Sequence, residues 1–166
     1  KFSLIYSPFK SAEFYANYGA GFHSNDARGT TIVVDPVDRT TPVSKVDPLV
    51  KAIGSELGVR TELVKGWTST LALWKLNMAS ELLFIGDAGT TEPSSPSKRY
   101  GVEWNNFYAI NKNLSLDIDL AWAHSRFVNE LNQQTLIPGA VSSTANIGLT
   151  IDNQGPWFGS VRLRYF

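Results

Sequence analysis

Apolar and polar residues alternate one by one along most of this chain. The clearest run extends from Leu114 to Trp122, where even-numbered positions are large and apolar while odd-numbered positions are polar or small. Successive side chains of an extended strand point to opposite faces, so the alternation predicts strands with one apolar and one polar face. Helical periodicity is weak, and its one candidate segment, Pro48 to Leu57, is interrupted by Gly54.

The alternation predicts about eight strands. In chain order they are Lys1 to Tyr6, Glu13 to Phe22, Val50 to Leu63, Trp67 to Ile85, Arg99 to Ile110, Leu114 to Phe127, Ala140 to Ile151, and Trp157 to Phe166. In the fourth of these, the apolar residues move from odd-numbered to even-numbered positions after Leu73. This change predicts a bulge or a phase slip near Leu73.

The connections between the predicted strands alternate strictly between short and long. The short ones (7–12, 64–66, 111–113 and 152–156) are rich in turn-forming residues, and the long ones are 23–49, 86–98 and 128–139. In an antiparallel meander this alternation places every tight turn at one end and every long loop at the other. Outer-membrane barrels are built in this way, whereas soluble Greek-key sandwiches seldom are. The chain is therefore predicted to be all-β, an antiparallel meander of a transmembrane outer-membrane β-barrel, with a soluble sandwich as the alternative.

Aromatic residues near the ends of the apolar faces favour the membrane interpretation. Trp157 and Tyr165 lie eight residues apart on one face, which corresponds to roughly 20–25 Å, about the height of an outer-membrane apolar band. The opposite faces should line a wet lumen and form cross-strand ion pairs. These faces have two interpretations: a substrate pathway, or a scaffold that hydrates the inner wall and holds an inserted plug domain. Their predicted lumen-facing residues are Glu56, Arg60, Glu62, Glu103, Asn105, Asp117, Asp119, Arg162 and Arg164.

Composition and charge exclude several functional classes. The 166 residues contain 15 Lys and Arg against 15 Asp and Glu, whereas a nucleic-acid-binding domain normally has a basic surplus. Cysteine is absent, and only His23 and His124 supply imidazole, which is too little for a His-rich metal centre or a catalytic triad. Asp117 and Asp119 have no nucleophile beside them. We therefore expect no enzymatic activity, no metal site, no cofactor and no nucleic-acid partner.

The long loops are the expected place for ligand specificity. At the end of the second predicted strand, His23, Asp26 and Arg28 bring an imidazole, a carboxylate and a guanidinium together in sequence. These three residues are the predicted ligand-binding group. The alternative interpretation is that the segment makes hydrogen bonds that close its own loop.

Several phrases of the chain resemble a known family, the TonB-dependent outer-membrane receptors. Each phrase is weak alone, but they occur in the family's order and cover nearly all of the chain. The similar segments are Glu13 to Gly29 (EFYANYGAGFHSNDARG), Ser55 to Thr61 (SELGVRT), Arg99 to Trp104 (RYGVEW), Leu114 to Ala121, and Ile137 to Leu149 (IPGAVSSTANIGL). The resemblance is to the carboxyl-terminal part of the receptor barrel, so residues 1–166 are expected to form a single barrel segment, incomplete at both ends.

The resemblance implies a barrel of about 22 strands in the bacterial outer membrane that imports ferric siderophores, cobalamin or similar scarce ligands. Its implied partners are outer-membrane lipid, a small-molecule ligand such as a metal chelate, the receptor's own plug domain and, through that plug, the TonB complex. No plug sequence is present among these residues. Two alternatives stay open: a complete small eight-stranded outer-membrane barrel with a structural or adhesive role, and a soluble ligand-binding barrel. The directions of the first and last predicted strands favour a segment of a larger barrel, as does the placement of Phe166 on the face of Arg162 and Arg164.

Overall fold

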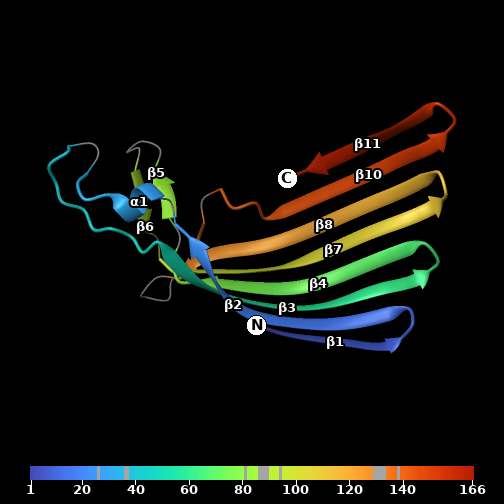
Figure 1. Cartoon of the computed structure of the whole chain (residues 1–166), viewed down its shortest axis with the longest axis horizontal. Coiled ribbons are helices and arrows are strands. Elements are labelled where there is room, and N and C mark those ends of the chain that lie inside the picture. The colour runs from blue at the N-terminus through green and yellow to red at the C-terminus, as the bar shows by residue number, and fades with distance from the viewer. Residues whose placement is uncertain are drawn as a thin grey trace.

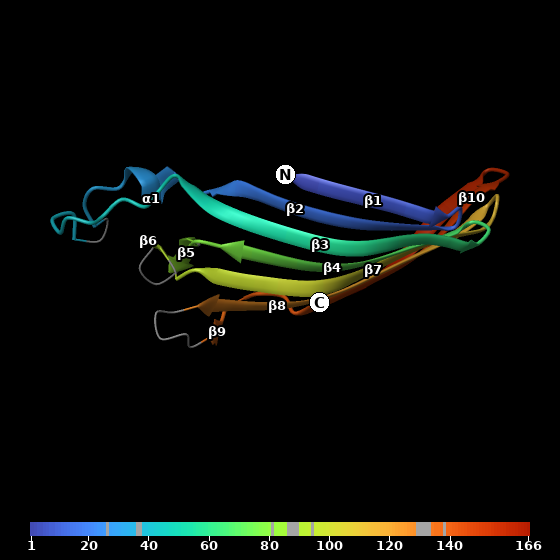
Figure 2. The same cartoon turned by 90° about the horizontal axis from the view of Figure 1, so that it is seen from below.

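The computed structural model describes residues 1–25, 27–35, 38–80, 82–85, 90–93, 95–128, 134–137 and 139–166. Most of them form one curved antiparallel sheet, with the tight turns at one end and the longer connections at the other (Figure 1, Figure 2). Its strands are β1 (Phe2–Phe9), β2 (Ala12–Ser24), β3 (Leu49–Val64), β4 (Trp67–Met78), β7 (Ser97–Asn111), β8 (Leu114–Val128), β9 (Gln134–Leu136), β10 (Ser143–Gln154) and β11 (Trp157–Tyr165).

The strand order confirms the predicted meander. The sheet runs β1-β2-β3-β4-β7-β8-β10-β11, and the short β9 pairs with β8 beyond the end of β10. Every pairing is antiparallel, and β1 and β11 are the two edges. The remaining elements lie in the long connections: the short helix α1 (Ala27–Thr31) and a hairpin of β5 (Leu82–Ile85) and β6 (Thr90–Pro93). Among the described residues, no helix is long and apolar enough to cross a membrane.

The predicted fourth strand is wrong in two respects. There is no slip near Leu73, because β4 pairs without interruption from Ser69 to Met78 with β3 and from Trp67 to Met78 with β7. The strand also ends at Met78, and Leu82–Ile85 belongs to the separate hairpin.

A small core beneath the loops explains the change in hydrophobic pattern along β4. Met78, Ser97 and Phe127 are register partners on three neighbouring strands, and all three are buried. Val50 and Ile137 are buried as well. The apolar residues after Leu73 therefore reflect local burial at the long-loop end of one face, and the backbone register is unchanged.

The register separates the sheet into two chemically different faces. Residues directly opposite one another on paired strands share a face. We call the face that bears Leu57, Leu73 and Trp122 the apolar face, and the opposite face, with Arg60 and Asp119, the polar face. On the apolar face Leu57 is 61% exposed and Val161 on the edge strand 77% exposed. An apolar surface of this extent marks contact with a partner or a membrane.

Polar groups on the apolar face are hydrogen-bonded to one another. The Trp67 Nε1 atom donates to Asn106 Oδ1 at 3.2 Å, and the Trp104 Nε1 atom donates to Ser69 Oγ at 2.9 Å. Asn106 is only 9% exposed, and its side-chain amide also donates to the Ile118 carbonyl oxygen at 3.4 Å. Internal pairing of this kind is what a surface surrounded by hydrocarbon requires.

Candidate functional site

The polar face carries a continuous row of hydrophilic side chains across the sheet. Each member lies directly opposite the next on the neighbouring strand, so the row crosses from β2 to β11 over about 29 Å at ordinary strand spacing. Its members, in order, are Glu13, Arg60, Thr70, Asn105, Asp119, Asn146 and Arg164. The row combines both signs of charge with neutral groups, as a hydrated wall does.

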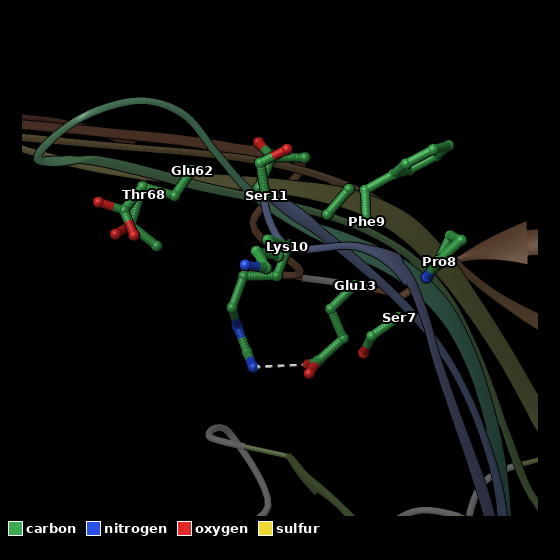
Figure 3. A pocket seen from close by; sticks show the side chains of 11 residues that line it. Ser7, Pro8, Phe9, Lys10, Ser11, Glu13, Glu62 and Thr68 are labelled. Atoms are coloured by element: carbon green, nitrogen blue, oxygen red, sulfur yellow. Dashed lines mark hydrogen bonds and ion pairs between the residues drawn. The ribbon is translucent and has the colours of Figure 1, made fainter.

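The first ion pair of this face joins β2 to β3. The Arg60 Nη1 atom donates to Glu13 Oε1 at 2.9 Å, and the two side chains are 56% and 34% exposed. They border a hollow of about 640 Å³ at the short-turn end, which is also lined by Lys10, Glu62 and Thr68. Figure 3 shows this hollow from close by, with the ion pair of Glu13 as a dashed line. The hollow is open, and its lining mixes these charged and hydroxyl groups with apolar side chains such as Phe9 and Pro8.

The second ion pair spans three strands. Arg162 on β11 and Asp117 on β8 are both register partners of Gly148 on β10 between them. The Arg162 Nη2 atom donates to Asp117 Oδ1 at 2.9 Å across that strand. A Cβ atom at Gly148 would lie 2.5 Å from the Asp117 carboxylate, so glycine is what lets the carboxylate lie over β10.

The remaining predicted lumen residues lie on the same polar face. Glu103 belongs to the row of Tyr15, and Glu56 lies in the next row toward the long loops. The Tyr15 hydroxyl group interacts with the Glu56 carboxylate. The structure thus places together on one face the predicted residues Glu56, Arg60, Glu62, Glu103, Asn105, Asp117, Asp119, Arg162 and Arg164.

The predicted set of lumen-facing residues does not include Glu13, Thr70 and Asn146, although their alternation parity assigns them to this face. Their partners could not have been found in that way, because Glu13 and Arg60 are 47 residues apart and meet only through the register of β2 and β3.

The predicted loop group is only partly described. His23 lies near the end of β2, opposite Val50, and is exposed. Arg28 lies in α1, but its side chain is outside the described part of the structure, as is Asp26 altogether. Whether these three residues form a ligand site stays a prediction.

The neighbouring Asn25 closes the neck of the long loop. Its backbone N–H donates to the Pro48 carbonyl oxygen at 3.0 Å, and its side-chain amide donates to the Asp47 carbonyl oxygen at 2.6 Å. These bonds are of the loop-closing kind proposed as the alternative for this segment. They hold the start of the loop against its end.

A polar turn organises the tip of the same loop. The Asp38 carboxylate accepts hydrogen bonds from the Thr41 hydroxyl group and from the backbone N–H groups of Thr41 and Thr40. These bonds, led by that of the Thr41 hydroxyl group, lower the pKa of Asp38 to about 2. Asp38 is therefore a fixed negative charge at neutral pH.

Metal-ligand chemistry is not assembled in the part of the chain that the structure describes. No group of at least three His, Asp or Glu side chains there is arranged to hold a metal ion. The described site is a polar face of the sheet that carries two ion pairs.

No family model matches this sequence, and no curated protein matches it. Solved structures do match. The copper transporter OprC aligns with 98% of this chain at a TM-score of 0.72 and 17% sequence identity, over 25% of OprC. The FrpB iron transporter from Neisseria meningitidis aligns with 93% of this chain at a TM-score of 0.61 and 15% identity, over 24% of FrpB. The alcaligin outer-membrane receptor FauA from Bordetella pertussis aligns with 98% of this chain at a TM-score of 0.62 and 15% identity, over 28% of FauA.

The chain therefore spans about a quarter of the length of the solved structures that it matches. At these identities the likeness establishes the fold, which is that of a wall segment of an outer-membrane receptor barrel. The resemblance to the barrel of TonB-dependent outer-membrane receptors, which the sequence alone indicates, is confirmed for the fold.

Proposed function

We propose that this chain supplies part of the barrel wall and of the extracellular loops of a TonB-dependent import receptor in the bacterial outer membrane. The observation that carries the proposal is the match of nearly the whole chain to a segment of transporters and receptors for copper, iron and alcaligin. The imported ligand would be a scarce small molecule such as a metal chelate, a ferric siderophore or cobalamin. In this proposal the chain is a structural part of the barrel and has no enzymatic activity.

The two faces support this placement. The apolar face suits the hydrocarbon of the bilayer, and the polar face suits a water-filled lumen. The edge strands β1 and β11 present backbone groups that would be unsatisfied in lipid. Further strands of the receptor are expected to pair with them and close the barrel.

We infer that the polar face is a scaffold for a plug domain more than a substrate pathway. Its arginines Arg60 and Arg162 are each paired with a carboxylate of the wall itself, so their charge is already partly neutralised before any ligand arrives. Both guanidinium groups are still about half exposed and can also bond to a polar domain inside the barrel. Coupling to the TonB complex would pass through that plug.

The proposal is tested by uptake in the bacterium that makes the protein. A strain without the gene should lose energy-dependent uptake of one labelled metal chelate, and the complete protein should restore it. An uncoupler should abolish the restored uptake, because import through such receptors depends on the energised inner membrane. Unchanged uptake of every chelate and of cobalamin in the deletion strain would refute the import function.

The loop between β2 and β3 is the proposed ligand contact, and its deletion tests that assignment. Removing Asn25 to Ser44 from the complete receptor should impair uptake while leaving barrel assembly intact, as judged by heat-modifiable migration in gels. Uptake unaffected by this deletion would remove the loop, with His23, Asp26 and Arg28, from the binding site. Conductance of a closed pore formed by the isolated 166 residues in planar bilayers would favour the small-barrel alternative.

A further inference from the structure

The strand pair β4–β7 has no tight turn to fix its register. A short turn fixes the register of a hairpin, but residues 79–96 between these strands form a long connection that contains the separate hairpin β5–β6. Alternation of polar and apolar residues does not fix the register either, because a slip of two residues keeps every side chain on its own face. Another contact must therefore select the observed pairing, which is regular from Trp67 and Tyr108 to Met78 and Ser97.

Two hydrogen bonds on the apolar face join β4 and β7 reciprocally. Ser69 and Asn106 are direct register partners, and each follows a tryptophan that lies two residues earlier in the chain. The Trp67 Nε1 atom donates to Asn106 Oδ1 at 3.2 Å, and the Trp104 Nε1 atom donates to Ser69 Oγ at 2.9 Å. Because the strands are antiparallel, each indole reaches diagonally across to the acceptor on the other strand. We call these four residues the indole clamp.

The surroundings of the indole clamp offer its polar groups few other partners. Asn106 is only 9% exposed, and Ser69 is half-buried. Asn106 and both indole rings line a hollow of about 410 Å³, whose other lining residues include Tyr108, Leu116 and Ile118. In hydrocarbon no water is available to replace a lost partner, so an unpaired indole N–H or side-chain amide is costly there. A register that separates the clamp residues is therefore disfavoured in the membrane.

A slip of two residues would break both bonds at once. In the register that brings Ser69 opposite Tyr108, Asn106 would lie opposite Leu71, and each indole would be four residues away from its acceptor along the strands. That offset is roughly 13 Å at the rise of a β-strand, which is beyond the reach of a hydrogen bond. The same slip would displace the long-loop end of β7 by roughly 7 Å relative to β4.

We propose that the indole clamp sets the register of β4 and β7 as the barrel assembles, and that it thereby positions the base of the long connection between them. The neighbouring pairs β3–β4 and β7–β8 are joined by the short turns 65–66 and 112–113, which fix their registers. An error in register would therefore arise at β4–β7, which is where the clamp lies. The inference rests on the proposed membrane placement of the apolar face, and it does not depend on what the receptor imports.

Disulfide cross-linking of the complete receptor in outer membranes measures the register, and residues 1–166 contain no cysteine that would interfere. Thr70→Cys combined with Asn105→Cys places thiols on direct partners of the polar face and reports the observed register. Thr70→Cys combined with Phe107→Cys reports the slipped register, because these positions are diagonal in the observed pairing and too far apart for a disulfide. With the clamp intact, the first pair should cross-link and the second should not.

Trp67→Phe combined with Trp104→Phe removes both donors and keeps an aromatic ring at each position. The ratio of slipped to observed cross-link should then rise about tenfold, which corresponds to ~1.4 kcal/mol for the two bonds together. Trp122→Phe combined with Trp157→Phe is the matched control, since neither of these indoles donates a hydrogen bond within the described part of the chain. The control should leave the ratio unchanged. Heat-modifiable migration identifies the folded barrels of each variant.

Equal cross-link ratios in the clamp variant and in the control would overturn the inference. If the double variant forms no folded barrel, Trp67→Phe alone should raise the ratio by a smaller factor, and an unchanged ratio in that variant would overturn the inference too. The cross-links are measured without any ligand, so this outcome is separate from that of the uptake assay. A receptor that imports its ligand but keeps its register without the two indole N–H groups refutes the clamp alone. One that slips without them but imports nothing supports the clamp and refutes the proposed function.

Discussion

Neighbouring residues of β8 face opposite environments. Ile118 lies on the apolar face between Asn106 on β7 and Ile147 on β10, and Trp104 and Leu116 line the same surface. Asp117, one residue earlier, lies on the polar face opposite Gly148 and is paired with Arg162. The backbone hydrogen bonds of the two residues belong to the same ladder, so the difference arises from side-chain direction alone.

This comparison shows that a shift of one residue in the pairing of β8 would be enough to misassemble the wall. A shift of register by one residue would exchange the two faces along the whole strand. Such a shift would break the ion pairs and the apolar contacts at the same time, so both sets of interactions oppose it. The predictions below test the two faces in order of decreasing effect.

The largest effect is expected from charge on the apolar face. Ile118→Arg in the complete receptor should cost roughly 2–4 kcal/mol, because a guanidinium group would lie near the bilayer midplane. The fraction of receptor that folds into lipid vesicles at increasing urea measures this cost. Asp117→Asn is the matched control on the neighbouring position and should be nearly silent. Lipid-quenching probes that report contact at Asp117 and none at Ile118 would invert the assignment of the faces.

A smaller loss is expected where the polar face leaves no room for a side chain. A Cβ atom at Gly101 would meet the Trp122 backbone carbonyl oxygen and the Trp74 ring. Because backbone atoms cannot swing aside, Gly101→Ala should destabilise the barrel by about 1–3 kcal/mol in the same urea titration. Gly54→Ala is the control, since its nearest atoms would be at 3.8 Å, an ordinary contact distance. Equal stability of the two variants would contradict the close packing at Gly101.

The ion pairs of the polar face should contribute least to stability. Arg162 is 44% exposed and Asp117 24% exposed, so solvent screens their attraction, and the coupling should be below about 1 kcal/mol. A double-mutant cycle of Asp117→Asn and Arg162→Gln measures it directly. A coupling of several kcal/mol would mean that this ion pair is a main contributor to the stability of the wall, contrary to the prediction.

The loop turn at Asp38 should respond to acid without affecting the barrel. The pKa of Asp38 is lowered from 3.8 to about 2, so the bonds to Thr40 and Thr41 are fully formed above pH 3.8. They are lost as the pH falls through about 2, where the carboxylate is protonated. NMR shifts of the Thr40 and Thr41 amides should titrate with that midpoint, and Asp38→Asn should remove the transition. A midpoint at the ordinary value would contradict the turn.

Much of the wall is determined by local sequence. Alternation from Leu114 to Trp122 places Asp117 and Ile118 on opposite faces of the strand, whichever strands pair with it. The reason is that side-chain direction along a strand repeats every two residues. The lengths of the connections were sufficient to predict the meander and to place tight turns at one end. The same reasoning failed along β4, where the burial of Met78 beneath the loops mimicked a change of register.

Tertiary structure decided which polar groups meet. Asp117 and Arg162 are 45 residues apart, and their contact depends on the registers of two strand pairs and on the missing side chain of Gly148. Odd or even position along a strand assigns each residue to a face. Its position along the strand direction, relative to residues of the other strands, depends on the register of every pairing in between. Pairing is a long-range property that no single segment contains.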